Sequence, residues 1–559
     1  MKKGIKGIPK VRQEFSKKYF DELLDRVKDN KRLPSWVGEL YFEFHRGTYT
    51  SMAKNKRNNR KAEYRMMELE LLSVLAQKAL AYPKAEMDEM WRTILRNQFH
   101  DILPGSSIGE VYEVTDKEYA EIFAETEKML EERLTSATPA GEGVSVWNTL
   151  GFDRNTVVEL GDLAASALTD GVEVYPVQKT EKGAIAYVKN VPSKGYKALE
   201  ATEAANVENP FAITAEGIIT PHYIIKIDDK GQFTSIFDKE AGREVLQEGK
   251  IGNELRVYED KPRNFDNWNV DAYYTEKSYP VVENAVCEWI EKGPVRATLK
   301  VTKNLLDNPF VQLIHFYADS RRIDFETEVD WKLSQHLCKV HFPVEIHTDE
   351  ATFDIQFGNL TRKIHQNTSW DEARFESCAQ KWMDLSEGGY GVSLMNDCKY
   401  GHSALDRNMS ITLFKAGTEP FEKADLERHV FTYALYPHMG TWKEADTVQE
   451  SFDLNVAAHA VKGGKAGDAF SFLSVDQKNV VLETVKAAED GNGIIVRLYE
   501  VANKRTKVTL QANAQIATMK ETNLIEEDAE FGKTGLKVEG DKASFTILPY
   551  EIKTFRITF

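Results

Sequence analysis

The residues of this chain best suited to chemistry are His100 and Asp101, which close a helical run just before a turn. Apolar residues recur with helical spacing between residues 87 and 95, and Pro104-Gly105 forbids further helix. A neutral imidazole can bind a metal, and a carboxylate beside it can orient a ligand or accept a hydrogen bond from a sugar hydroxyl. Because a metal site needs three or four convergent ligands, the residue types alone favour a satisfied structural histidine.

A second polar segment, residues 38–51, contains His45, Arg46 and Tyr49. Apolar and polar residues alternate before His45, which is typical of a strand, but a helix-to-loop segment inside a helical bundle explains the pattern equally well. Gly47 lets the chain turn and approach a ligand closely. The stretch from 48 to 61 is dense in Lys and Arg. We interpret it as a solvated basic face rather than a nucleic-acid site, although it could place an arginine in a polar pocket.

Two further sets of residues lie in the later part of the chain. His341, Glu345 and His347 share strand parity, which allows a metal site but favours a solvated strand face, and Pro343 predicts an edge strand or none. Aromatic and acidic groups of the kind that bind sugars also recur, although loop structure and satisfied core polar groups explain them as well. They are Trp370, Asp371, Trp382, Asp384, Asn396, Asp397, His429 and His438.

The elements that must position these residues change in type near Pro139. Before it, helical periodicity predicts helices over 16–27, 61–82, 85–100 and 116–134, the last three forming an antiparallel bundle. After it, short β-branched and aromatic runs alternate with turns, and the run 322–330 has one apolar and one charged face. The chain is therefore expected to be an α+β multidomain protein with two or three antiparallel β-sandwich units.

Composition excludes several classes of function. With 559 residues, a net charge of −16 and 42% hydrophobic residues, the chain is a folded acidic protein, so nucleic acid and anionic membranes are not expected partners. Nothing approaches the ~20 apolar residues of a membrane span, and the basic N-terminus lacks a signal-peptide core. Four scattered cysteines indicate a reducing compartment, so we expect a cytoplasmic protein. Motifs of serine hydrolases, P-loop enzymes, dinucleotide-binding enzymes and HExxH metalloproteases are absent from the sequence.

Several collinear motifs resemble α-mannosidases of glycoside hydrolase family 38. Residues 38–51, 56–60 and 97–107, the last reading Asn-Gln-Phe-His-Asp-Ile-Leu-Pro-Gly-Ser-Ser, are similar to the central region of that family. The segments 351–358, 367–371, 380–386, 394–401 and 433–438 are similar to its β-rich region in the cytoplasmic and bacterial branch. The resemblance runs from about residue 33 to the C-terminus.

The resemblance implies a three-helix bundle followed by β-sandwich domains of the supersandwich type. The expected divisions are a remnant of the preceding catalytic domain (1–32), the bundle (33–138), a small β domain (139–210), a large β-sandwich (211–464) and a C-terminal β-sandwich (465–559).

The resemblance also implies a function. In that family a zinc ion binds mannose hydroxyls in a retaining hydrolysis, and His100 matches one of the zinc ligands. Asp101 would hydrogen-bond the sugar, and His45, Arg46 and Tyr49 match the motif of a substrate-binding segment without assigned roles. The other zinc ligands, the nucleophile and the acid/base belong to an N-terminal barrel, which nothing before residue 33 could form. We therefore expect no complete catalytic set here, and no activity from this chain alone.

Three hypotheses follow from this expectation. The first is a segment of a zinc-dependent α-mannosidase that acts on mannose-containing oligosaccharides together with its N-terminal catalytic domain. The second is a carbohydrate-binding or structural β-sandwich protein without the catalytic half. The third is that the catalytic barrel is a separate polypeptide that assembles with this chain. Under the first and third, an exposed apolar patch should remain on the helical domain. Assembly into a homo-oligomer is compatible with all three.

Overall fold

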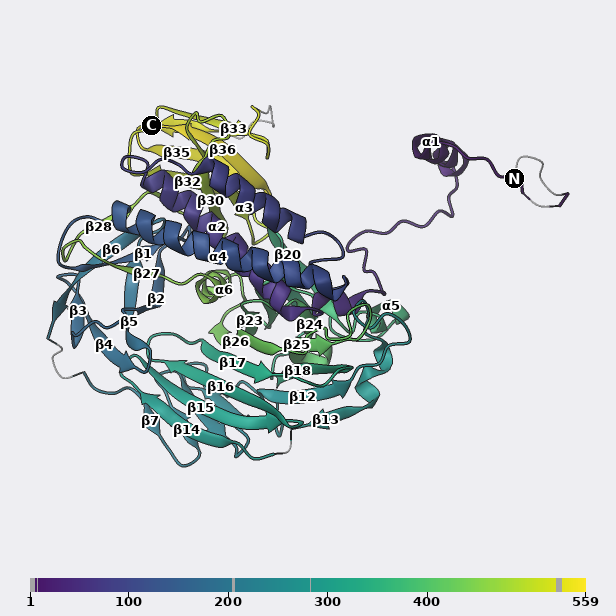
Figure 1. Cartoon of the computed structure of the whole chain (residues 1–559), viewed down its shortest axis with the longest axis horizontal. Coiled ribbons are helices and arrows are strands. Elements are labelled where there is room, and N and C mark those ends of the chain that lie inside the picture. Colours follow the sequence, from purple (N-terminus) through teal and green to yellow (C-terminus); the bar gives the residue numbers. More distant parts are fainter. Residues whose placement is uncertain (1–5, 8, 204–206, 282, 529–534) are drawn as a thin grey trace. The chain divides into compact units, whose positions relative to one another are not determined.

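The chain was analysed as a computed structural model that describes residues 6–7, 9–203, 207–281, 283–528 and 535–559 (Figure 1). It divides into two units, Met1–Phe42 and Glu43–Phe559. In the first, helix α1 spans Ser16–Val27, the bounds that the helical spacing predicts. None of its residues is buried. No described helix of either unit is long and apolar enough to cross a membrane.

Three long helices of the second unit share one core. They are α2 (Ala53–Leu75), α3 (Lys84–Asn97) and α4 (Gly109–Ala137). Their common core contains Ala62, Met66, Leu69, Leu72, Met87, Met90, Ile94, Tyr119, Ile122, Met129, Leu130 and Leu134. Shorter helices are η1 (Arg46–Tyr49), η2 (Ala272–Glu276), α5 (Ser369–Glu372), η3 (Leu405–Arg407) and α6 (Thr447–Asn455). The structure thus contains a helical domain where the spacing predicts one.

Helix α2 begins eight residues before the predicted start, inside the basic stretch. The carboxylate of Asp425 accepts hydrogen bonds from the backbone N–H of Met52 at 2.6 Å and of Ala53 at 2.7 Å. An acceptor from a distant strand region thus satisfies N–H groups that a helix start leaves unpaired. Lys56 and Arg60 are only 4% and 3% exposed, so the interpretation as a solvated basic face is wrong.

In the described residues, every strand pairing is antiparallel and the strands form six sheets. The eight-stranded sheet consists of β1 (Val144–Asn148), β2 (Arg154–Glu159), β3 (Ala167–Thr169), β4 (Val174–Thr180), β5 (Gly183–Val191), β6 (Gly195–Thr202), β27 (His459–Lys462) and β28 (Ala469–Ser471). The five-stranded sheet consists of β7 (Ala212–Ile213), β8 (Gly217–Ile219), β9 (Tyr223–Ile227), β10 (Phe233–Asp238) and β11 (Arg243–Glu244).

The two largest β layers of the middle region are six- and nine-stranded. The former runs in the order β13 (Ser278–Pro280), β12 (Glu254–Glu259), β18 (His336–Pro343), β25 (Asn408–Ala416), β24 (Gly401–Ser403), β21 (Ser377–Cys378). The latter runs β14 (Val286–Lys292), β15 (Arg296–Leu305), β16 (Asn308–Tyr317), β17 (Ile323–Asp330), β26 (Arg428–Met439), β23 (Tyr390–Asn396), β22 (Trp382–Ser386), β19 (Glu350–Ile355), β20 (Gly358–Lys363). Side chains of both, and of the five-stranded sheet, share one apolar core.

The C-terminal region has two four-stranded sheets. One runs β29 (Leu473–Val475), β32 (Thr506–Ala512), β35 (Lys542–Ile547), β34 (Lys537–Glu539), and the other β30 (Val480–Ala487), β31 (Ile494–Glu500), β36 (Ile552–Thr558), β33 (Thr518–Thr522). Their core includes Leu71 and Val74 of α2. The helical domain is therefore packed directly against the C-terminal sheets, as Figure 1 shows.

Two strand predictions have different outcomes. The alternation in residues 322–330 is confirmed, because β17 lies antiparallel between β16 and β26. The prediction of an edge strand at Pro343 is wrong, since β18 pairs with β12 on one side and β25 on the other. Pro343 is tolerated because it is the last residue of β18, where the ladder ends.

Candidate functional site

His100 and Asp101 lie in the turn that follows α3, three and four residues beyond its last residue, Asn97. The expectation that the helix itself carries them is wrong, and the consequence is exposure: the His100 side chain is 77% exposed and that of Asp101 is 42% exposed. Nε2 of His100 lies 3.2 Å from Oδ2 of Asp101. This imidazole faces solvent and is not part of a core.

Large apolar side chains surround this turn without being buried. Leu95, Phe99 and Ile108 are 59%, 57% and 52% exposed, and the Phe99 ring lies 4.4 Å from the His100 ring, centroid to centroid. A soluble surface rarely leaves adjacent large apolar groups exposed unless something binds there. The expected apolar patch on the helical domain is therefore present beside His100.

The turn is held in one conformation by local hydrogen bonds. The hydroxyl of Ser106 donates to Oδ1 of Asp101 at 3.1 Å, and the Tyr112 hydroxyl donates to the Asp101 carbonyl at 3.3 Å. Gly105 adopts a φ of +92°, and a Cβ there would lie 2.3 Å from the carbonyl oxygen of Ser51. Both the backbone conformation and the lack of space require glycine at this position.

The buried ammonium of Lys56 joins this turn to the segment that precedes α2. Its Nζ donates to the carbonyls of Ser51 at 2.5 Å, Leu103 at 2.9 Å and Pro104 at 3.0 Å. Three donors meet three acceptors, so the ammonium is fully used. Burial lowers the pKa of Lys56, while the nearby Asp425 carboxylate opposes that shift. Lys56 is thus a positioning residue for the turn that bears His100.

We predict that Lys56→Met loosens this turn. Methionine fills a similar volume but leaves three carbonyls without their donor, at about 1–3 kcal/mol for each buried acceptor left unpaired. Amide hydrogen exchange of residues 102–106 should accelerate by about tenfold or more, while exchange in the middle of α4 stays unchanged. Lys61→Met, on the same helix and 29% exposed at its side chain, is the matched control. Equal exchange in wild type and Lys56→Met would contradict the assignment.

The second predicted segment is a loop and the short helix η1, not a strand. His45 is exposed and left-handed with a φ of 66°, and Tyr49 is half-buried. Arg46 is buried, donates to the Ala373 carbonyl at 2.8 and 3.2 Å, and lies 4.4 Å above the Phe375 ring. Gly47 approaches the backbone of Asn269, because a Cβ there would lie 2.9 Å from the Asn269 nitrogen.

The described residues contain no group of three or more His, Cys, Asp or Glu side chains arranged to hold one metal ion. Zinc in a protein takes three or four such ligands. His100 and Asp101 therefore fit as contributors to a metal site but do not form one by themselves.

The other candidates from the sequence are placed inside the fold. His341 is buried between the Tyr258 hydroxyl and Asn408, and burial lowers its pKa to about 3, so it is neutral. The prediction that this strand face is solvated is therefore wrong for His341. Among the predicted sugar-binding groups Trp370 is 59% exposed, whereas Trp382, Asp384, Asn396, Asp397, His429 and His438 are buried. Asp384, for example, is a core polar group with its hydrogen bonds satisfied: its carboxylate accepts from His438 at 2.8 Å and from Ser393 at 2.7 Å.

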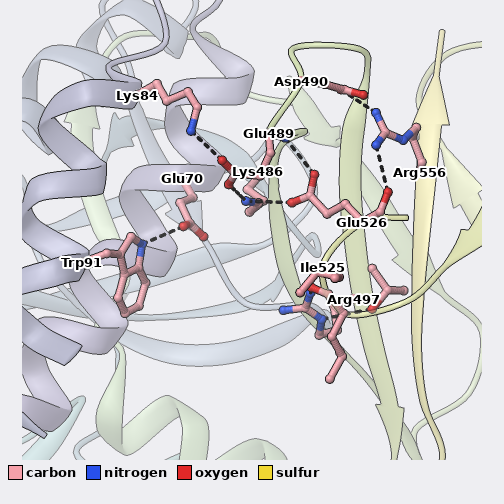
Figure 2. Close-up of polar contacts among 12 residues, drawn as sticks. Glu70, Lys84, Trp91, Lys486, Glu489, Asp490, Arg497, Ile525, Glu526 and Arg556 are labelled. Atoms are coloured by element: carbon pink, nitrogen blue, oxygen red, sulfur yellow. Dashed lines mark hydrogen bonds and ion pairs between the residues drawn. The ribbon is translucent and has the colours of Figure 1, made fainter. Parts of the chain in front are cut away.

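A cleft of about 1230 Å³ is lined by residues of α2, α3 and a C-terminal sheet, beside the contact that packs α2 against that sheet, and the sequence did not reveal it. Figure 2 shows Glu70 of α2 accepting a hydrogen bond from the indole of Trp91 at 2.9 Å. Burial raises the pKa of Glu70 to about 7. At the rim, Lys84 at the start of α3 pairs with Glu489 at 2.5 Å, and Lys486 pairs with both Glu489 and Glu526. The Lys84–Glu489 pair connects the two walls across 405 residues of sequence, whereas the pairs of Lys486 lie within the C-terminal wall.

Comparison with known proteins assigns three stretches of the chain to one family. Residues 43–136 match the alpha mannosidase middle domain, residues 218–423 the glycosyl hydrolases family 38 C-terminal domain, and residues 479–555 the family 38 C-terminal beta sandwich domain. The first of these stretches contains both His100 and the helices that position it.

Individual relatives agree with this assignment. The chain is 32% identical to Alpha-mannosidase 2C1 of Homo sapiens and 30% identical to Alpha-mannosidase G of Dictyostelium discoideum, over 98% and 99% of its own length. It covers 52% and 55% of those proteins, and so spans about half their length. The crystal structure of an alpha-mannosidase from Enterococcus faecalis V583 shares the fold, with a TM-score of 0.76 at 17% identity over 96% of this chain and 72% of that one. The chain belongs to glycosyl hydrolase family 38, of which it carries the middle and C-terminal domains.

Proposed function

We propose that this chain forms the middle and C-terminal part of an α-mannosidase that hydrolyses terminal α-mannosyl residues with retention, using zinc. His100 supplies one zinc ligand, and Asp101 accepts a hydrogen bond from a hydroxyl of the bound sugar. When bound, zinc would contribute a positive charge that holds mannose hydroxyls. His45 is exposed and Tyr49 half-buried, and both are proposed sugar contacts, whereas buried Arg46 would act by holding their segment.

The observation that carries this proposal is the exposed His100–Asp101 pair on a rigid turn, inside a region that matches the family's middle domain. Lys56, Ser106 and Gly105 fix the turn, and the apolar surface around Phe99 is suited to cover by another domain. We accordingly propose that residues 33–138 act as a three-helix bundle that docks a catalytic domain, followed by β domains at 139–210, 211–464 and 465–559 in the supersandwich arrangement. A mannose-containing oligosaccharide is the proposed substrate.

The test is hydrolysis of an aryl α-mannoside with added zinc. We expect no turnover by the purified 559-residue chain, because one imidazole and one carboxylate neither hold zinc tightly nor provide a nucleophile. The chain should become active when fused behind the part of Alpha-mannosidase 2C1 that precedes the matched region. In that fusion, His100→Ala should lower kcat/KM by at least about a hundredfold, because it removes a metal ligand.

Two outcomes would contradict the proposal. Turnover by the isolated chain that His100→Ala abolishes would place a complete site within these residues. Full activity of the fusion that carries His100→Ala would show that His100 is not part of the site. The matched control is His347→Ala, which removes an exposed histidine from a loop of the β domain.

A second candidate is a non-catalytic carbohydrate-binding protein, and the large cleft is the observation that favours it. Trp91 and Phe357 line the cleft together with Glu70, which combines aromatic surface with a hydrogen-bonding carboxyl group. Saturable binding of a mannose oligosaccharide by the isolated chain that Trp91→Ala weakens, together with an inactive fusion, would support this alternative. Binding lost only with Asp101→Asn would support the first proposal.

A further inference from the structure

A second, smaller cavity lies where α2 begins, and it is lined by positive charge. Its volume is about 270 Å³. The lining residues come from the first turns of α2, from the turn after β23 and from the start of β26; they are Ala53, Lys54, Arg57, Cys398, Lys399, Arg428, His429 and Val430. Four of these carry a positive charge and none a negative one, in a chain whose net charge is −16.

Two of the four cations already have partners. The ammonium of Lys54 pairs with Asp116 at 2.6 Å and with Glu427 at 3.5 Å. The guanidinium of Arg428 pairs with Glu328 through two hydrogen bonds of 2.6 and 2.7 Å. The charges of these two residues are balanced by carboxylates, so neither residue supplies the unbalanced positive charge of the cavity.

The other two cations, Arg57 and Lys399, have no carboxylate or other oxygen acceptor among the residues that the structure describes. Lys399 is only 4% exposed, and its ammonium lies 4.1 Å above the centroid of the Phe431 ring. Burial lowers the pKa of Lys399; the negative charges of Asp397 and Asp425 oppose this shift, and the positive charge of Arg57 adds to it. No carboxylate of the described residues lies within ion-pair distance of the buried ammonium, so the cavity between Lys399 and Arg57 leaves a place for an anion.

The N-terminal end of α2 adds positive potential to the cavity but does not by itself form the binding site. Asp425 already accepts from the N–H groups of Met52 and Ala53, so the side chains, not the helix end, would hold a ligand. The ring of His429 donates through Nε2 to the Asp425 carbonyl at 2.8 Å, and burial lowers its pKa to about 3, so it stays neutral. The charge of the cavity therefore rests on the lysines and arginines.

We propose that this cavity binds a phosphate dianion, either as free orthophosphate or as the monoester of a small molecule. Two unpaired cations match the double charge of phosphate better than the single charge of a carboxylate. A guanidinium presents a planar fork of donors that suits phosphate oxygens, and an ammonium adds a point charge. The volume accommodates a phosphate group with a small substituent but not a polymer. The proposal does not depend on mannosidase activity, because it concerns a separate cavity.

The test is calorimetric titration of the purified chain with orthophosphate at constant ionic strength and pH 7.5. We expect one saturable site, and both Arg57→Gln and Lys399→Met should weaken it by about tenfold or more, since each removes a charge-assisted contact. Arg65→Gln is the matched control, because Arg65 lies on the same helix, is 35% exposed at its side chain and pairs with Glu127. It should bind as wild type does.

Thermal unfolding without phosphate identifies variants that fail to fold. Arg57 is only half-buried, so Arg57→Gln decides the question even if Lys399→Met is unstable. A hexose 6-phosphate and the parent hexose are titrated in parallel: tighter binding of the ester assigns the cavity to a phosphate monoester, and binding no tighter than orthophosphate assigns it to free phosphate. No saturable binding up to about 10 mM, or equal binding by wild type and Arg57→Gln, would overturn the proposal.

Discussion

Arg60→Ala should destabilise the second unit by about 3–5 kcal/mol. The guanidinium of Arg60 is buried and donates to Oδ1 of Asn396 at 2.8 Å, to the Gln380 carbonyl at 3.0 Å and to the Tyr400 hydroxyl at 3.1 Å. It also lies 4.4 Å above the Tyr400 ring. The substitution would leave a cavity and several acceptors without this donor, at the contact between α2 and the turn after β23.

Urea unfolding followed by tryptophan fluorescence measures this effect as a lower midpoint with an unchanged slope. Arg65→Ala, five residues further along α2, removes an arginine that is 35% exposed at its side chain and pairs with Glu127, so it should cost less than about 1 kcal/mol. Similar losses for the two variants would show that the buried contacts of Arg60 are not what holds α2 against the sheets. Arg60→Lys should recover little, because an ammonium cannot reproduce the planar fork.

The same contact explains what the sequence does and does not reveal about the fold. The spacing of apolar residues predicts α1 with its observed bounds and places three further helices, because periodicity is a local property. The start of α2 is not predictable in this way. It depends on Asp425, which is 372 residues away from Ala53 in sequence, and Arg60 meets Asn396 across 336 residues.

For the candidate site, residue types and resemblance select His100 and Asp101, but not how they are held. The turn is fixed by Lys56, which sequence reasoning placed on a solvated face because a lysine is rarely buried. The signal was present in the alternation of small polar and basic residues along 51–60, which the structure buries almost throughout. The large cleft gave no such signal, because residues of α2 and α3 line it together with residues of a C-terminal sheet that are far away in sequence.

His402→Gln should make stability less sensitive to acid, and the sign follows from the contacts of the imidazole. The Tyr400 carbonyl, 3.0 Å from Nδ1, can only accept, so Nδ1 carries the proton. Nε2 then accepts from the amide of Asn396 at 3.2 Å. A second proton would place two donors face to face in a buried position. Burial accordingly lowers the pKa of His402 from 6.5 to about 3.

Because the folded pKa lies below the unfolded one, the unfolded chain binds the proton more readily as the pH falls. The stability that neutral His402 contributes is therefore complete above pH 6.5 and is lost progressively toward pH 3, at about 1.4 kcal/mol for each pH unit. Glutamine can accept from Asn396 but does not titrate. Any advantage of wild type over His402→Gln at pH 7.5 should thus shrink by about 2 kcal/mol at pH 5.

Urea unfolding at pH 7.5, 6 and 5 measures this difference, and comparing two variants cancels the contributions of other titrating groups. Such groups include Glu70 and Glu427, whose pKa values burial raises to about 7 and which change stability in the opposite sense. His347→Gln, which removes an exposed imidazole outside this network, is the matched control. A difference between wild type and His402→Gln that stays constant with pH would mean that folding does not lower the pKa of His402, so that the folded protein accepts the second proton as readily as the unfolded chain. The network from Arg60 through Asn396 to His402 would then have a different polarity.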